Sequence, residues 1–423
     1  GDVQFPNNQT GKLEKIGDWG QLLNHDTFKA FENLKNEPAP YLQILPNATV
    51  SLLKGLQESD LQRTFEAKGL GDLYQISANR ILASMEQINA NKDNFNKVLD
   101  QIQLIHEEIG TLLAIAQPHS IEDFNAMMRK NTDLMPKDFD PSIQPNFFLK
   151  NSGMRGLATV FTGVESLKGS GQLNIAVQND TYYESAFVIT GDKEHSTLGN
   201  REHSLFSLDG DKVNETAQTM QEKLGGQKLD LYLCEFHHNI SYSKTDYHME
   251  NLTEQVDKLF AKDMVSDKFT VAIDNTIAQT NGQEFKDFLK HNEQRIKDGK
   301  LNIVFYRSAQ KFDMLGMDNY NGGIMSVINN GKDFNAFNSK MESSEGREDK
   351  LSQINIQGFS HFEKYAQKEL NDYRAGIMKA ASNLANPDSG SPLAFPKAMY
   401  HASSDDMSHP NALLKIAPNT DPS

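Results

Sequence analysis

Residues 269–276 read FTVAIDNT and residues 301–311 read LNIVFYRSAQK, and the fold can be worked out from these two runs. Each begins as a continuous apolar segment, Phe269–Ile273 in the first and Leu301–Phe305 in the second. Continuous apolar strands are typical of a parallel sheet that is covered on both faces. Four other runs have the same character and are expected to be strands of the same sheet: Leu173–Val177, Ser204–Leu208, Leu229–Leu233 and Ile324–Ile328.

Helical patterns, such as those of residues 212–224 and 251–262, lie between these strands. The alternation predicts an α/β fold with a mostly parallel sheet flanked by helices. Apolar residues recur at helical spacing over residues 60–115 and predict two or three amphipathic helices. The first 60 residues are mixed and polar, and four prolines in 117–147 predict a winding connection. We therefore expect an N-terminal segment with a helical insertion (1–146), a large domain (147–335) and a small C-terminal domain (336–423).

Composition excludes several classes of protein. The 423 residues carry a formal net charge of -15, which argues against a nucleic-acid binder. No apolar run approaches the roughly 20 residues that a membrane-spanning helix needs. Cys234 is the only cysteine, so an intramolecular disulfide and a cysteine-rich zinc site are excluded. No signal peptide is visible, and a cytoplasmic location is expected.

Polar residues follow the strands where a ligand would bind, since open α/β sheets bind ligands beyond the carboxyl ends of their strands. These residues are Asp274-Asn275-Thr276 and Ser308-Ala309-Gln310-Lys311, and Ser152-Gly153-Met154-Arg155 precedes a helical run. The backbone N–H groups of a helix start with small residues can bind a phosphate. A lysine in a desolvated pocket can form a Schiff base, and a carboxylate can keep a pyridine nitrogen protonated. A pyridoxal-phosphate enzyme needs these three parts together.

At these residues the chain resembles the fold-type-I pyridoxal-phosphate enzymes, most closely the Cys/Met-metabolism branch of cystathionine lyases and synthases. That branch has Ser-Gly-Met before its phosphate-binding helix, as in Ser152–Met154 here, and Asp-Asn-Thr, as in 274–276. Its Schiff-base lysine lies in Ser-x-Thr-Lys followed by an aromatic residue, which is similar to Ser308–Phe312. A Gly-Gly pair opens the next strand, as at 322–323. The resemblance covers about residues 147–330.

The resemblance implies an aspartate-aminotransferase-like transferase fold with extra N-terminal helices and a short C-terminal lobe. It implies that Lys311 holds pyridoxal 5'-phosphate as a Schiff base and that Asp274 keeps the pyridine nitrogen charged. Tyr182 or Tyr183 would stack on the cofactor ring. The other residues that the resemblance assigns to the cofactor are Ser152, Gly153, Met154, Arg155, Thr276, Ser308, Gln310 and Asn239.

An amino acid is the substrate that the resemblance implies, with elimination or replacement chemistry, although transamination uses the same parts. The family builds its site across a subunit interface, so a homodimer or higher homo-oligomer is expected, without nucleic acid or membrane. Two residues depart from the family. Gln310 replaces a phosphate-binding threonine, and Lys415 stands where an arginine grips the substrate carboxylate. A lysine binds a carboxylate only as a point charge.

These departures favour a second hypothesis, in which the fold is kept but catalysis is lost and the chain is a binding or interaction protein. Plainer roles are also open, because Lys311 could be a surface lysine and Asp274 could cap a helix. A Cys234–His237 hydrolase has no visible third member. A metal site at Glu235, His237, His238 and His248 matches no zinc signature.

Overall fold

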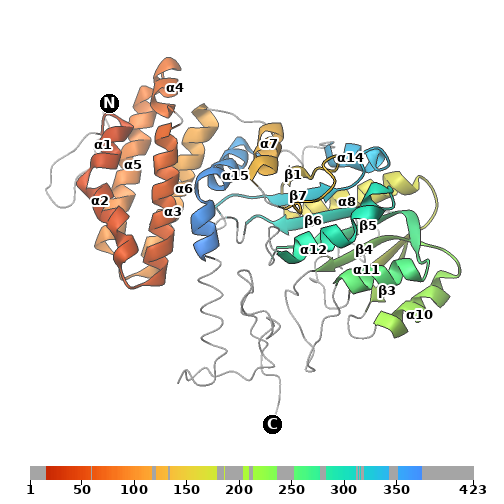
Figure 1. Ribbon diagram of the computed structural model, residues 1–423. Coiled ribbons are helices and arrows are strands. Elements are labelled where there is room, and N and C mark those ends of the chain that lie inside the picture. Colours follow the sequence, from red (N-terminus) through yellow and green to blue (C-terminus); the bar gives the residue numbers. More distant parts are fainter. Residues whose placement is uncertain are drawn as a thin grey trace, which may run out of the picture. The chain divides into compact units, whose positions relative to one another are not determined.

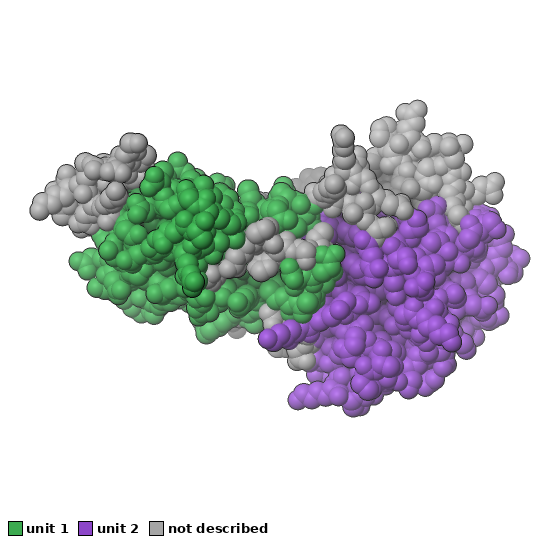
Figure 2. Space-filling view, turned by 90° about the horizontal axis from the view of Figure 1, so that it is seen from above, with its two compact units in different colours: residues 1–127, 310–321, 351–376 green, residues 128–309, 322–350, 377–423 purple. Residues whose placement is uncertain are grey.

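The computed structural model describes residues 16–58, 60–116, 121–131, 134–178, 185, 203–208, 213–235, 252–276, 283–310, 313, 315, 319–342 and 351–373. Two compact units emerge from the contacts within the chain (Figure 2). The first unit contains the described residues of 1–127, 310–321 and 351–376. The second contains those of 128–309, 322–350 and 377–423.

The second unit is built on a seven-stranded sheet with the order β1-β7-β6-β5-β4-β2-β3 (Figure 1). Strands β2 to β6 run parallel to one another, and β7 is antiparallel to both of its neighbours. The predicted class, a mostly parallel sheet flanked by helices, is confirmed. The strands are β1 Asn146–Lys150, β2 Leu173–Gln178, β3 His203–Leu208, β4 Leu229–Glu235, β5 Val265–Asp274, β6 Leu301–Ser308 and β7 Gly323–Ile328.

All six predicted strands are present, and β1 was missed. It is a five-residue run that follows Pro145 and ends in a lysine, so it resembles a linker in sequence. Its pairing with β7 buries Phe147–Leu149. These residues are buried because β1 pairs with β7, and this could not be recognised from the length or polarity of the run.

Helices cover both faces of the sheet. Helix α8, Gly153–Lys168, packs on one face together with α14, Asn335–Glu342, and their apolar residues share a core with Leu233, Ala272 and Val304. On the other face, Phe285 contacts Phe305 edge to face at 5.1 Å. The helices here are α10 Val213–Leu224, α11 Leu252–Ala261, α12 Gln283–His291, which carries Phe285, and α13 Glu293–Lys297.

Strand alternation fixes which strand-end residues lie on the α8 face. Leu231 and Leu233 of β4, Ala272 of β5, and Val304 and Tyr306 of β6 all belong to the α8-side core. Because successive side chains point to opposite faces, the next same-face residues are at the carboxyl ends of these strands. They are Glu235, Asp274 and Ser308.

The first unit is helical. Its core is apolar, and Tyr320 is buried in it: the Tyr320 ring lies against Gly110 and Gly358, and its hydroxyl donates to the His106 carbonyl at 2.5 Å. The helices are α1 Trp19–Asn24, α2 Asp26–Asn33, η1 Leu34–Asn36, α3 Pro40–Glu58, α4 Leu61–Ala67, α5 Gly71–Ala90, α6 Phe95–Ala116 and α15 Gln353–Tyr365.

The two or three helices predicted for residues 60–115 are present as α4, α5 and α6. The sequence predicted no helix for two further segments that contain one. Residues 16–58 are mostly helical, because the apolar face of α3 is buried although Pro46 lies inside the helix. The winding connection also contains a helix, α7 Ile121–Asn131, with Phe124 and Met128 buried at helical spacing. The three-domain division stays a prediction, since most of the C-terminal part lies outside the described residues.

Candidate active site

Helix α8 begins beside the carboxyl end of β6. Ser152 is its N-cap, and the Ser152 Oγ accepts a 3.0 Å hydrogen bond from the Arg155 backbone N–H. The first N–H groups of a helix have no partner within the helix, so those of Gly153 and Met154 form a short array of donors. The helix dipole adds a partial positive charge at the same place. The start of α8 therefore suits an anion.

Two glycines let this helix start approach the sheet. A Cβ atom on Gly153 would lie 2.8 Å from the Ser308 backbone nitrogen. A Cβ atom on Gly323, at the start of β7, would overlap the Ser152 carbonyl. Side chains are excluded at both positions because backbone already occupies the space. The predicted Ser-Gly-Met, Ser308 and Gly-Gly motifs are thus in direct contact in the fold.

Asp274 is held at the end of β5 by its own loop. Its Oδ1 accepts a 2.9 Å hydrogen bond from the Thr276 N–H. The Thr276 Oγ1 accepts a 3.1 Å hydrogen bond from the Ser308 N–H, which joins the ends of β5 and β6. The Asn275 N–H donates to the Tyr306 carbonyl at 2.9 Å. Asp274, Thr276 and Ser308 therefore form one hydrogen-bonded group.

A row of polar side chains crosses three adjacent strands at this edge. The strand register aligns Glu235 with Asp274 and Asp274 with Tyr306. Glu235 is 2% exposed, and its N–H donates to Gln178 Oε1 at 2.9 Å. Tyr306 is 1% exposed. Burial raises the pKa of the Tyr306 phenol, and the charge of Asp274 raises it further. The sequence analysis did not identify Tyr306 or Gln178 as site residues. Tyr306 could have been found because it lies two residues after the buried Val304 and therefore on the same face of β6.

Cys234 is fully buried between these strands, on the face opposite to α8. Burial raises the pKa of its thiol well above the ordinary value, and the charges of Glu235 and Asp274 raise it further. A thiol that stays protonated is a poor nucleophile. The geometry therefore disfavours the Cys234 hydrolase, whose partner His237 lies outside the described residues.

Other predicted site residues are placed as follows. Met154 packs partly buried against the α8-side core, so its side chain contributes packing. The Gln310 Nε2 donates to Asn321 Oδ1 within the first unit. The predicted roles of the following residues stay predictions, because the residues lie outside the described part of the chain: Lys311, Tyr182, Tyr183, Asn239 and Lys415.

Two features are absent from the described residues. Among them, no group of three or more histidine, cysteine or acidic side chains is arranged to hold a metal ion. His237, His238 and His248 lie outside the described residues. Within the same ranges, no helix has the length and apolar character needed to cross a bilayer.

Comparison with known proteins gives matches only among solved structures. No protein-family model and no curated protein sequence matches the chain. An aromatic-amino-acid aminotransferase from Burkholderia pseudomallei, covalently bound to pyridoxal phosphate, is similar at 12% identity, with a TM-score of 0.44 over 66% of this chain and 69% of that chain. An aminotransferase from Anaerococcus prevotii gives 14% identity and a TM-score of 0.43 over 64% of this chain and 66% of that one. A multiple-substrate aminotransferase from Thermococcus profundus gives 10% identity and a TM-score of 0.40, over 67% of this chain and 68% of that chain.

Proposed function

We propose that the chain is a pyridoxal-phosphate-dependent enzyme that acts on an amino acid, by transamination or by elimination or replacement. The observation that carries this proposal is one juxtaposition. The start of α8, at Ser152–Gly153, lies against the Ser308 backbone, and Thr276 joins Ser308 to the loop of Asp274. An anion site and a carboxylate are thus fixed on one face of the sheet, beyond the carboxyl ends of parallel strands.

The residues present fit the cofactor. The space beside Gly153 is filled by the Ser308 backbone, so the start of α8 lies close against the carboxyl end of β6. The N–H groups at the start of a helix can bind a phosphate. The hydroxyls of Ser152 and Ser308 stand at the same place and can donate to phosphate oxygens. Asp274 can accept a hydrogen bond from a protonated pyridine nitrogen. Lys311 follows Ser308 by three residues in the sequence.

When bound, pyridoxal phosphate supplies an aldehyde for amine condensation and a ring that withdraws electrons. In this proposal Lys311 would hold the cofactor through its amine and would move the proton at the substrate α-carbon. Asp274 keeps the proton on the ring nitrogen in place. The α8 start and Ser308 would hold the phosphate. Tyr182 or Tyr183 covers the ring, and Lys415 pairs with the substrate carboxylate.

A second candidate function keeps the fold without catalysis. The Gln310 side chain, at the position of a family phosphate-binding threonine, is engaged with Asn321. If Gln310 does not contact the phosphate, one of the family's phosphate contacts is missing. A missing contact of this kind favours a binding or interaction protein. The two candidates differ in whether adding an amino acid changes the absorbance of the protein with bound pyridoxal phosphate.

The test is borohydride reduction of the protein after incubation with pyridoxal phosphate, followed by peptide mass mapping. We expect a reduced adduct on Lys311, lost in Lys311→Ala. The matched control is Lys300→Ala, since Lys300 is an exposed lysine immediately before the other end of β6. A change in cofactor absorbance when amino acids are added would support the enzyme hypothesis. If the protein binds pyridoxal phosphate but no amino acid changes its absorbance, the second candidate is supported. Failure of the wild type to form any adduct at Lys311 would contradict the proposed function.

A further inference from the structure

Residues 310–321 connect two strands of the sheet, yet they belong to the helical first unit. Strand β6 ends at Ser308, and its neighbour β7 begins at Gly323. Ala309 and Gly322, which flank the segment, belong to the second unit, where the Ala309 N–H donates to the Gly322 carbonyl at 2.9 Å. A connection between two sheet strands is therefore built into the other unit of the chain.

Tyr320 holds this segment in the first unit. Its side chain is 2% exposed and occupies the space beside two glycines of different helices, Gly110 of α6 and Gly358 of α15. A Cβ atom on Gly110 would lie 3.0 Å from the ring, and one on Gly358 would overlap it. Phe359 contacts the ring edge to face, with centroids 5.9 Å apart, and the phenol donates to the His106 carbonyl. The close fit and the hydrogen bond together fix one position of the ring.

Two further hydrogen bonds hold residues next to Tyr320 and next to Lys311. The Asn321 backbone N–H donates to Asn355 Oδ1 of α15 at 3.1 Å. The Asn321 Oδ1 accepts from the Gln310 Nε2, and Gln310 immediately precedes Lys311 in the sequence. Both bonds lie at the surface, so the buried ring of Tyr320 is the main anchor of the segment.

We propose that Tyr320 is a positioning residue for the segment 310–321, and that the reactivity of Lys311 depends on this anchor in the first unit. The inference rests on the proposed function and deepens it, because it gives the N-terminal helices a part in the reaction. A reacting side chain has to be held in place, and ordering its backbone costs conformational entropy. Tyr320 acts through the backbone of its own segment and touches no reacting atom.

The test uses Gly358→Ala in the full-length protein without added cofactor. The new Cβ atom displaces the Tyr320 ring, while position 320 itself is unchanged. We expect hydrogen exchange at the Ala309 and Asn321 amides to become faster by a factor on the order of ten, as measured by site-resolved mass spectrometry. Both amides form hydrogen bonds that depend on the anchored segment. Unchanged exchange at both would overturn the proposal.

Gly55→Ala is the matched control. Gly55 also lies inside a helix of the first unit, α3, and its added Cβ atom would lie 2.6 Å from the ring of another tyrosine, Tyr365. Both variants gain the same helix propensity and create the same kind of clash. We expect Gly55→Ala to lower the stability and to leave exchange at Ala309 and Asn321 unchanged. An equal acceleration in both variants would show a general loosening of the helices and would contradict the proposal.

Tyr320→Phe decides the case in which Gly358→Ala does not fold. The ring stays and only the hydrogen bond to the His106 carbonyl is lost, so we expect exchange at Ala309 and Asn321 to become about threefold faster. Its control is Tyr41→Phe, because the Tyr41 phenol likewise donates to a backbone carbonyl of the first unit, that of Lys92, at 2.7 Å. Equal exchange rates in these two variants would refute the anchor.

The cofactor gives a separate readout, the rate at which pyridoxal phosphate forms a borohydride-reducible adduct on Lys311. We expect Gly358→Ala to slow this step by a factor on the order of ten and Gly55→Ala to leave it unchanged. An equal rate in Gly358→Ala and the wild type would overturn the positioning role. If the wild type forms no adduct on Lys311, the proposed function fails, and the exchange measurements alone decide whether Tyr320 anchors the segment.

Discussion

The backbone N–H of Ser308 donates a 3.1 Å hydrogen bond to the Thr276 side-chain oxygen. The two residues are 32 positions apart in the sequence and follow different strands. Through this bond, the segment that leads to Lys311 is joined to the loop of Asp274. The α8 start lies against the same Ser308 nitrogen, so this bond is at the centre of the candidate site.

Thr276→Val removes the acceptor for the Ser308 N–H at nearly constant volume. We expect a loss of about 1–3 kcal/mol in the free energy of unfolding, because a part-buried donor is left without its partner. Thr276→Ser keeps the hydroxyl and is expected to retain most of the stability. Urea unfolding measures both variants. Equal stability of Thr276→Val and the wild type would show that the bond contributes nothing.

Gly153→Ala introduces a Cβ atom that cannot be accommodated without moving the Ser308 backbone. We expect a destabilisation of roughly 1–3 kcal/mol and at least a tenfold weaker uptake of pyridoxal phosphate. Gly71→Ala is the control, since Gly71 is likewise the first residue of a helix, α5, but its added Cβ would make only an ordinary 3.7 Å contact. If both variants bind the cofactor equally, the close approach at Gly153 has no part in binding.

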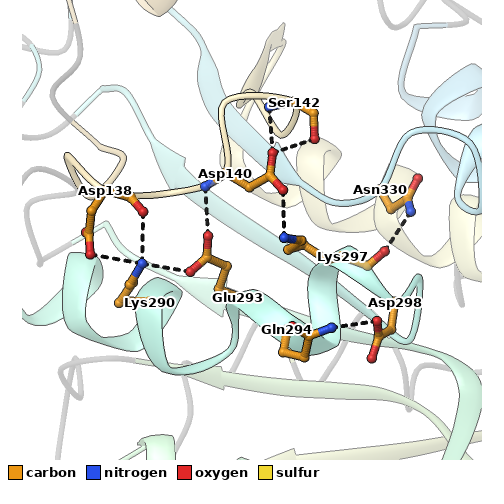
Figure 3. A network of polar contacts seen from close by, with 9 residues as sticks. All are labelled: Asp138, Asp140, Ser142, Lys290, Glu293, Gln294, Lys297, Asp298 and Asn330. Carbon is orange, nitrogen blue, oxygen red and sulfur yellow. Dashed lines mark hydrogen bonds and ion pairs between the residues drawn. The ribbon is translucent and has the colours of Figure 1, made fainter.

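An ion-pair network joins the connection before β1 to α12 and α13 (Figure 3). Lys290 lies 2.8 Å from Glu293 and 3.0 Å from Asp138, and Lys297 lies 2.9 Å from Asp140. The hydrogen bond from Lys297 lowers the pKa of Asp140, whose charged form is thereby favoured in the folded state. Its contribution is present above the unfolded carboxyl pKa and is lost as the pH falls through the lower folded value.

Lys297→Met is therefore expected to lower the melting temperature at pH 7, with a smaller difference in 1 M salt because screening weakens exposed pairs. The difference should also shrink in strong acid, where Asp140 is protonated in both forms. Calorimetry at the two salt concentrations measures this effect. Lys300→Met serves as comparison, because Lys300 forms no ion pair within the described residues. A salt-independent difference would contradict an electrostatic origin.

Two buried histidines of the helical unit predict sensitivity to acid. Burial lowers the pKa of His106 to about 3 and that of His361 to about 4. The unfolded state, with a histidine pKa near 6.5, then binds more protons than the folded state, so stability falls as the pH drops below about 6.5. For His361 the loss by pH 4 is on the order of 3 kcal/mol.

His361→Gln keeps a donor for the Leu52 carbonyl, to which His361 Nε2 is bonded at 2.8 Å. We expect the variant to lose less stability than the wild type between pH 6.5 and pH 4, as measured by denaturant unfolding at a series of pH values. If stability falls equally with pH in the wild type and in His361→Gln, His361 is not a cause of the acid sensitivity.

Much of the sheet could be predicted because burial on both faces leaves a local signal. All six predicted strands are present, and β5 and β6 extend beyond their predicted ends: β5 by one residue, to Asp274, and β6 by three, to Ser308. Strand β1 and helix α3 were missed for one reason. Asn146–Lys150 is short and polar at its ends, and α3 contains Pro46, so both depend on partners that are distant in the sequence.

The sequence by itself determined which residue types stand at the strand ends, because strand length and apolar character are local properties. It placed Asp274, Ser308 and the Ser152-Gly153 turn beyond strands or before a helix. Only the tertiary structure decided that Gly153 touches Ser308, that Thr276 joins two strand ends, and that Tyr306 shares a face with Asp274. Strand order and register are set by packing between distant segments, and no single segment carries that information.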